Sequence, residues 1–359
     1  MTGRRVLVAM SGGVDSSVTA ALLQEQGYEV IGATMQLWSD CLPHSEAESG
    51  CCSISAVEDA RRVATRLGIP YYVFNMADAF TTAVVDRFAD AYLNGLTPNP
   101  CLLCNRDLKF GLFLDKAREL DCDFIATGHY ARVWFDDARK RYCLGKGKDT
   151  GKDQSYALYM LTQEQLAHTL LPLGDLNKQD TRRIAARYGL QVAQKKESQE
   201  ICFVPNNNYR EFMEQYRPGS AKPGPIVNLE GDVLGTHTGL ANYTIGQRKG
   251  LGIGGGKPHF VVRLEVDRNA VVVGAAADVY QTSCRAEDVN WIAVPDLDAP
   301  LQVDAKIRYR VEPAQAVINL EADGRVVTRF LRPQRAVTPG QAVVWYQDDV
   351  VIGGGIITR

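Results

Sequence analysis

Hydrophobic and polar positions alternate in two different ways along the chain, and the change falls near residue 205. Before it, β-branched runs such as RRVLVAM (4–10) and YEVIGATMQLW (28–38) flank a segment with helical spacing, VTAALLQEQG (18–27). The series continues with a helix, a strand and a later strand at AVEDARRVATRLG (56–68), PYYVFNM (70–76) and CDFIATGHYARV (122–133). Because alternating strands and helices form βαβ units, we expect an α/β domain with a doubly wound parallel sheet and helices on both faces.

After residue 205 the pattern is that of short strands separated by turns with Gly, Asp or Pro. LEADGRVVTRF (320–330) contains the Asp-Gly pair typical of a hairpin. The alternation weakens between Ala277 and Trp291, which we interpret as the join between two β-rich domains. The predicted domains are an α/β domain at 1–205, a small mainly β domain at 206–278 and a β-barrel at 279–359.

The composition of the chain indicates the class of protein and the state of its cysteines. The chain has 359 residues, 45% of them hydrophobic and 23% charged, which is typical of a soluble globular protein. No apolar stretch approaches the roughly 20 residues of a membrane span, and the amino terminus is too polar for a signal peptide. We therefore expect a cytoplasmic protein whose nine cysteines stay reduced for burial, metal binding or catalysis. The net charge of −2 neither supports nor excludes an RNA partner.

SGGVDSS, residues 11–17, is the first motif with a chemical meaning, because it joins the first strand directly to a helix. Gly12 and Gly13 allow a tight turn, the serines add hydroxyl donors, and the helix presents its positive end, so we predict a phosphate cradle. The common G-x-x-x-x-G-K-[ST] loop is absent from the sequence. SGGVDSS resembles the pyrophosphate loop of the ATP pyrophosphatase superfamily, which cleaves ATP to AMP and pyrophosphate while adenylating a substrate.

A second glycine-rich stretch does not indicate a nucleotide-binding loop. GLGIGG (250–255) satisfies the dinucleotide motif G-x-G-x-x-G, but Lys257, Pro258 and an extended run follow it instead of a helix. We predict a loop between β elements.

The two cysteines of TPNPCLLCNRDLKF (97–110) have several chemical uses open to them. A C-x-x-C pair serves as half a zinc site, a redox couple, part of an iron–sulfur site, or one reactive thiol beside an ordinary one. The other segments of the chain are needed to choose between these uses.

An ordered series of motifs narrows that choice. SGGVDSS and PNPCLLCN are followed by ATGHYAR (126–132), GKDQSYALY (151–159), ESQEICFV (197–204), IGQRKGLGIGG (245–255) and TPGQAVVWY (338–346). The series is similar to that of the tRNA-specific 2-thiouridylases, which convert the wobble uridine of tRNA to 2-thiouridine. The resemblance spans nearly the whole chain and implies an adenine nucleotide α-hydrolase-like fold for its first domain.

The resemblance implies a reaction with two parts. ATP with Mg²⁺ adenylates the C2 oxygen of the uridine, because that oxygen is a poor leaving group, and sulfur then displaces AMP. By resemblance Cys202 carries the sulfur as a persulfide, Cys104 is the nucleophile, and the two end as a transient disulfide. A cysteine desulfurase or a sulfur-carrier protein is the implied donor. The resemblance places ATP against Ala9, Met10, Ser11, Gly12, Gly13, Val14, Asp15, Ser16, Ser17, Met35 and Gly128.

Cys101 departs from the family pattern, in which many members have Asp at this position. A thiol can act as acid or base if its pKa lies near neutrality. Alternatively, Cys101, Cys104 and Cys202 hold three irons of a [4Fe–4S] cluster that binds sulfide at the fourth. Both routes are compatible with the spacing.

The resemblance also implies contacts with the anticodon loop of tRNA, whose target base must leave its stack. It assigns them to Asn99, Pro100, Cys101, His129, Lys152, Asp153, Gln154, Arg308, Tyr309 and Gln341.

The remaining cysteines have plainer interpretations. Cys122, Cys143 and Cys284 lie in strand-like runs, so we expect them to be packing residues. CLPHSEAESGCC (41–52) places Cys41, His44, Cys51 and Cys52 in a polar stretch. We interpret this stretch as a loop with incidental thiols, with a zinc site or an auxiliary sulfur role as alternatives. Another tRNA thiolase, lysidine synthase, and a non-catalytic RNA- or metal-binding protein are the rival functions.

Overall fold

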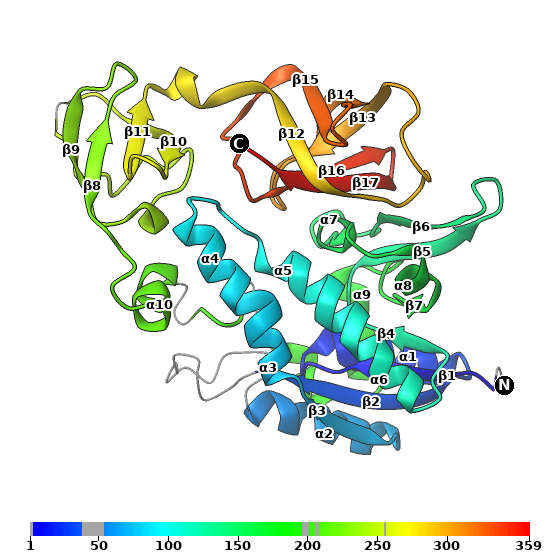
Figure 1. Ribbon diagram of the computed structural model, residues 1–359. Coiled ribbons are helices and arrows are strands. Elements are labelled where there is room, and N and C mark those ends of the chain that lie inside the picture. Colours follow the sequence, from blue (N-terminus) through cyan, green and yellow to red (C-terminus); the bar gives the residue numbers. More distant parts are fainter. Residues whose placement is uncertain (1–2, 38–53, 196–200, 205–207, 255) are drawn as a thin grey trace.

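The computed structural model describes residues 3–37, 54–195, 201–204, 208–254 and 256–359 (Figure 1). The first domain contains a five-stranded parallel sheet with the order β3-β2-β1-β4-β7. The strands are β1 (Arg5–Ala9), β2 (Glu29–Gln36), β3 (Tyr71–Asn75), β4 (Phe124–Ala126) and β7 (Thr169–Leu170). The order confirms the doubly wound α/β class.

Helices cover both faces of this sheet, and the alternation of β1 decides which residues meet which helices. Val6 and Val8 pack in one hydrophobic cluster with α1 (Val14–Glu25), α2 (Ile54–Leu67) and α9 (Lys178–Arg187). Leu7 and Ala9 belong to another cluster on the opposite face. The helical segments there are α3 (Ala77–Phe80), η1 (Thr81–Asp86), α4 (Arg87–Leu93), α5 (Pro100–Leu103), η2 (Cys104–Leu112) and α6 (Phe113–Glu119), with η1 and η2 π-helical.

The small middle domain is a four-stranded sheet of order β10-β11-β8-β9. Its strands are β8 (Gly224–Val227), β9 (Val233–His237), β10 (Phe260–Glu265) and β11 (Ala270–Gly274). The short helices nearby are α10 (Tyr209–Tyr216), η5 (Leu240–Asn242) and η6 (Ala276–Val279), whereas η3 (Gln191–Gln194) packs against α1 and α9 of the first domain. The described residues of the glycine-rich stretch, 250–254, form a loop that leads towards β10, so the prediction of a loop between β elements is confirmed.

The third domain is an antiparallel barrel of β12 to β17, and the pairing of β12 with β17 closes it. The strands are β12 (Tyr280–Trp291), β13 (Leu301–Lys306), β14 (Ala314–Leu320), β15 (Val326–Arg335), β16 (Ala342–Gln347) and β17 (Val350–Ile357). The predicted Asp-Gly hairpin joins β14 to β15. Figure 1 shows the barrel above the first domain and the middle sheet beside it.

One predicted element differs from the structure. The run 122–133 is not one strand: β4 ends at Ala126, and β5 (Ala131–Asp136) pairs with β6 (Arg141–Lys146), a hairpin that joins the barrel sheet through Val350 and Gly145. The run 277–291 is mostly the long strand β12, and its register shifts explain the weak alternation.

The connecting helices α7 (Ser155–Leu158) and α8 (Gln163–Ala167) lie between the first domain and the barrel (Figure 1). Among the helices that the structure describes, none is both long and apolar enough to cross a membrane.

Candidate functional site

The phosphate loop, residues 11–17, turns sharply between β1 and α1. Gly12 has φ +66°, a conformation that glycine adopts without strain, and Gly13 is the N-cap of α1 with no side-chain cap. The first N–H groups of a helix have no partner within it. This turn therefore presents backbone donors and the positive end of a 12-residue helix to an anion.

The serines of the loop divide between shaping it and facing outwards. Ser17 is buried and its Oγ donates to the Gly13 carbonyl at 2.8 Å, while the Ser16 Oγ accepts from the Ser11 N–H at 3.1 Å. Ser11 itself is exposed. Ser16 and Ser17 thus hold the loop, and Ser11 is the hydroxyl that a phosphate can reach.

Gly128, which follows β4, lies directly over this helix end. A Cβ added to Gly128 would be 2.8 Å from the Ser16 nitrogen and 2.9 Å from the Asp15 Cβ. Any side chain here would obstruct the donors of the loop, so the fit of a nucleotide phosphate depends on this glycine. The structure brings together the predicted residues Gly128 and Ser16, which lie far apart in the sequence of the first domain.

The other predicted ATP residues have side chains that pack mainly in the protein core. Met10 and Val14 have buried side chains that belong to the core cluster of Val6 and Val8. Ala9 closes β1, and Met35 is partly buried near the end of β2. Their side chains are explained by packing, except for Met35, which keeps an exposed portion.

Asp15 has partners that the sequence motif does not contain. The Lys178 Nζ lies 2.8 Å from both carboxylate oxygens, and the Tyr130 hydroxyl donates to Oδ1 at 2.7 Å. Tyr130 also contacts the Thr181 hydroxyl at 3.0 Å. Because the Lys178 side chain is only 12% exposed, this is a shielded ion pair at the mouth of the loop.

A second lysine reaches the other side of the loop. The Lys195 Nζ donates to the Gly12 carbonyl at 3.2 Å and lies 2.6 Å from a carboxylate oxygen of Asp59. Two lysines therefore flank the loop, and each is paired with a carboxylate, Asp15 or Asp59. Sequence reasoning missed Lys178, Lys195 and Thr181, since only Asn177, the N-cap before Lys178, gave a local signal.

The cysteine segment begins where a short helix is capped by Asn99. Its Oδ1 accepts the Cys101 N–H at 3.2 Å, and Pro100 occupies the first helical position. Cys101 is exposed, whereas Cys104 is buried and starts the π-helical turn η2. Such π-helical turns occur frequently at functional sites.

Cys202 is exposed on a short described segment, 201–204. Its neighbour Phe203 is buried against Phe80, Phe88 and Phe212, with ring centroids 5.1–5.7 Å apart. Phe203 and Cys104 belong to the same hydrophobic core. The Phe203 ring therefore anchors the chain beside Cys202 to the face of the sheet that carries the cysteine helix.

A shared metal centre does not follow from this placement. Among the described residues, no three His, Cys, Asp or Glu side chains are grouped so that they could hold a metal ion. Cys101, Cys104 and Cys202 are all described, and as placed they do not fit an iron–sulfur cluster.

Several predicted tRNA contacts have protein partners. Asp153 is buried and accepts from the N–H groups of Gly147 and Ser155, each at 3.1 Å. Gln154 accepts the Tyr130 N–H at 3.0 Å. Their side chains brace the turn, and Lys152 beside them is partly exposed.

His129 is held beside the nucleotide loop as a neutral ring. Its Nδ1 pairs with the Thr127 hydroxyl at 2.6 Å, and its ring packs against Phe110. Burial lowers the pKa of His129 well below its usual value, and Lys109 adds to this effect. At neutral pH the ring therefore carries no charge and can take part only in hydrogen bonds.

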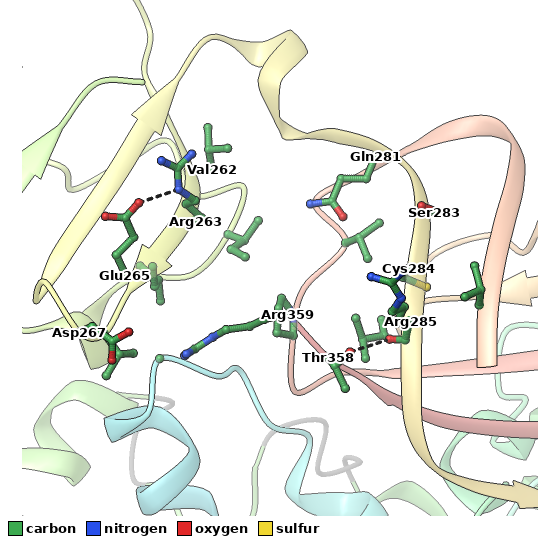
Figure 2. Close-up of a pocket in the computed structure, with 18 of the residues that line it drawn as sticks. Val262, Arg263, Glu265, Asp267, Gln281, Ser283, Cys284, Arg285, Thr358 and Arg359 are labelled. Atoms are coloured by element: carbon green, nitrogen blue, oxygen red, sulfur yellow. Dashed lines mark hydrogen bonds and ion pairs between the residues drawn. The ribbon is translucent and has the colours of Figure 1, made fainter. Parts of the chain in front are cut away.

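A cavity among the described residues lies away from these side chains. It has a volume of about 720 Å³ and lies between the β10–β11 hairpin, the barrel and the end of α4 (Figure 2). None of the predicted site residues is among its described lining. Most of its charges are paired internally, such as Arg263 with Glu265 and Arg285 with Glu321.

The remaining cysteines separate into buried and undescribed groups. Cys122, Cys143 and Cys284 are buried, which confirms their packing role. Burial raises the pKa of Cys122 to about 11 and that of Cys284 to about 12, so both thiols are inert at neutral pH. Cys41, His44, Cys51 and Cys52 lie outside the described residues.

Comparison with known proteins adds family models and named relatives. Residues 4–206 match the tRNA methyl transferase HUP domain, 210–275 its PRC-barrel domain and 281–357 the aminomethyltransferase beta-barrel domain. The chain is 58% identical to the tRNA-specific 2-thiouridylase MnmA of Moorella thermoacetica, over 98% of each chain. It is 56% identical to that of Heliobacterium modesticaldum (99% of this chain, 92% of that one) and 53% identical to that of Acetivibrio thermocellus (99% and 100%).

Proposed function

The chain belongs to the tRNA-specific 2-thiouridylase family, and from this membership we propose how its own residues carry out the reaction. It is a tRNA-uridine 2-sulfurtransferase that uses ATP. The observation that carries the proposal is the coexistence of an open phosphate cradle with exposed thiols outside it, because thiolation needs both activation and a sulfur carrier. The family models carry names for methyl and aminomethyl transfer, but a cradle paired with thiols fits sulfur transfer.

In the activation step, the C2 oxygen of the wobble uridine attacks the α-phosphorus of ATP, and pyrophosphate leaves. The backbone donors after Gly13 and the Ser11 hydroxyl bind the departing phosphates. Asp15 is the residue that would hold Mg²⁺, a hard cation that prefers oxygen ligands and neutralises phosphate charge. Lys178 would then exchange its carboxylate partner for a phosphate oxygen.

In the sulfur step, the terminal sulfur of a Cys202 persulfide attacks C2, and the bond from C2 to the adenylate oxygen breaks with release of AMP. The Cys104 thiolate then attacks the Cys202 Sγ. The sulfur–sulfur bond breaks, its electron pair stays with the sulfur on the base, and a Cys104–Cys202 disulfide forms. A dithiol reductant must restore both thiols, so we place the reaction in the cytoplasm.

Cys101 supplies the exposed thiol beside the base in place of a carboxylate, and we propose that it moves a proton during the exchange. The cluster route is the second candidate and requires the three thiolates to gather around iron. Asn99, Pro100 and His129 would face the flipped base, while Lys152, Tyr309 and the barrel would meet the tRNA backbone. A cysteine desulfurase or a sulfur carrier would load Cys202.

The test is thiolation of a tRNA transcript with ATP and a persulfide donor, with pyrophosphate release measured in parallel. We expect Cys104→Ala and Cys202→Ala to lose thiolation by more than about a thousandfold, since a missing nucleophile leaves only binding. Cys122→Ala, a buried thiol outside the site, is the matched control. Full thiolation by Cys202→Ala would contradict the persulfide route.

The iron content of the protein distinguishes the persulfide route from the cluster route. Iron and acid-labile sulfide would be measured in protein purified without oxygen, before and after chelation. Activity of iron-free protein supports the persulfide, whereas activity that depends on iron and on Cys101 supports the cluster. An absence of pyrophosphate release with tRNA present would instead support the non-catalytic RNA-binding alternative.

A further inference from the structure

The chain that leads into the cysteine helix is held by the barrel. We call residues 94–99 the junction segment. The Thr97 N–H donates to the Pro339 carbonyl at 2.9 Å, and the Thr97 carbonyl accepts from the Gln341 Nε2 at 2.6 Å. Both backbone hydrogen-bonding groups of Thr97 are therefore satisfied by the barrel.

Arg359 makes a further contact from the end of the barrel. Its guanidinium donates to the Asn94 carbonyl. Figure 2 shows this side chain extending from the barrel across the cavity, towards the chain that leaves α4. Asn94 and Thr97 of the junction segment are thus tied to the same domain.

The barrel side of this contact is a tight turn, residues 338–341, which we call the barrel turn. The Gln341 N–H donates to the Thr338 carbonyl at 3.2 Å, and the Gly340 N–H donates to the Ile357 carbonyl at 2.9 Å. Gly340 has φ +90°, and an added Cβ would lie 2.9 Å from the Thr97 nitrogen. Only glycine permits so close an approach.

Arg308 holds the base of the barrel turn. Its guanidinium donates to the Ala336 carbonyl at 2.9 Å and to the Thr338 hydroxyl. The side chain is half-buried, and burial lowers the pKa of Arg308. Arg308 and Gln341, both of which the resemblance assigns to tRNA, therefore direct polar groups to the protein.

At the other end, the junction segment continues directly into the cysteines. Asn99, two residues after Thr97, accepts the Cys101 N–H and starts α5. Helix α5 runs without a break into η2, whose first residue is Cys104. A shift of Thr97 therefore displaces the turn that carries both thiols.

We propose that Gly340 and Gln341 are positioning residues, through which the barrel sets the placement of the junction segment and hence of Cys101 and Cys104. The inference rests on the proposed role of these cysteines. A role of Gln341 as an RNA contact alone is the competing account.

The experiment compares Gly340→Ala and Gln341→Leu with Gly324→Ala. Gly324 lies in the β14–β15 turn with φ +84° and has no atom within 4 Å of an added Cβ, so it controls for the glycine conformation. Three quantities are measured: the Kd for tRNA, the single-turnover thiolation rate at saturating tRNA and ATP, and hydrogen exchange of the peptide spanning 94–104.

We expect the single-turnover rate of Gly340→Ala and Gln341→Leu to fall about tenfold or more, because misplacement of reacting groups by 1 Å costs up to about a hundredfold. The Kd for tRNA should change less than about threefold, and exchange of peptide 94–104 should accelerate. Gly324→Ala should match the wild type in all three measurements.

A weaker Kd with an unchanged rate and unchanged exchange would overturn the inference and make Gln341 an RNA contact only. If Gly340→Ala does not fold, Gln341→Leu decides by the same criteria. If the wild-type protein does not thiolate tRNA, the proposed function is wrong. The hydrogen-exchange measurement would still report whether the barrel turn holds the junction segment.

Discussion

In the phosphate loop several of the hydrogen bonds that shape the turn join residues a few positions apart, whereas the contacts of the junction segment come from the other end of the chain. Ser17 bonds Gly13, four positions away, while Gln341 bonds Thr97 across 244 positions. The turn of the loop is thus shaped largely by its own residues, whereas the placement of the junction segment depends on contacts with the barrel turn. Substitutions in the two regions should therefore have different effects.

The largest effect is expected where the loop depends on one glycine. In Gly12→Ala the residue must adopt φ +66°, and its Cβ would lie 2.2 Å from the Ala56 carbonyl oxygen, so the loop backbone has to move. We expect MgATP affinity to fall at least about a hundredfold, because the left-handed conformation alone costs about 1–2 kcal/mol and the contact adds to it. Calorimetric titration with ATP measures this loss.

Gly68→Ala is the matched control, because Gly68 has φ +67° and no atom within 4 Å of an added Cβ. It should lose about 1 kcal/mol of folding stability and keep its ATP affinity. Equal losses of affinity in both variants would show that backbone strain, and not the geometry of the loop, explains the result.

An intermediate effect is expected where the loop itself depends on distant residues. Lys178→Met removes the cation that faces Asp15 across 163 positions. We expect ATP affinity to fall about tenfold to a hundredfold, since hydrogen bonds between charged groups contribute about 1.5–3 kcal/mol. Arg183→Ala, an exposed position on the same helix, should have no effect on ATP titrations.

The double variant Asp15→Asn with Lys178→Met should regain stability without regaining ATP binding, because it removes both members of the ion pair. Recovery of ATP binding in the double variant would mean that Lys178 serves only to neutralise Asp15. The loop would then bind ATP largely through its own residues.

The smallest effect is expected on folding stability, from the buried Cys284 thiol of the barrel, in contrast to the exposed Cys101 and Cys202. Burial raises the pKa of Cys284 from 9.0 to about 12. Above pH 9 the unfolded chain loses this proton and the folded chain keeps it, so the free energy of unfolding falls as pH rises towards 12.

The contribution of this thiol is at most about 1.4 kcal/mol per pH unit. Cys284→Ala should therefore lose stability less steeply than the wild type between pH 9 and 11. Urea denaturation in a reducing buffer measures both slopes, and parallel curves would show that the Cys284 thiol ionises in the folded chain as it does in the unfolded one.

Local patterns were sufficient for much of the fold. The strand-to-helix alternation predicted the parallel sheet, and Asp323-Gly324 predicted the β14–β15 hairpin. The strand expected over 122–133 failed because Gly128 interrupts it and β5 pairs in the barrel sheet instead. Pairing partners are chosen by tertiary packing, which a single strand pattern does not encode.

For the site, the sequence by itself determined the phosphate loop with its glycines and serines, because these are defined by residue type and close spacing, whereas the proposed roles of the cysteines came from the family resemblance. Tertiary structure alone decided that Lys178 meets Asp15, that Cys104 is buried while Cys101 is exposed, and that the barrel turn holds Thr97. The physical reason is range: backbone conformation follows neighbouring residues, whereas ion pairs and burial depend on which distant surfaces the folded core brings together.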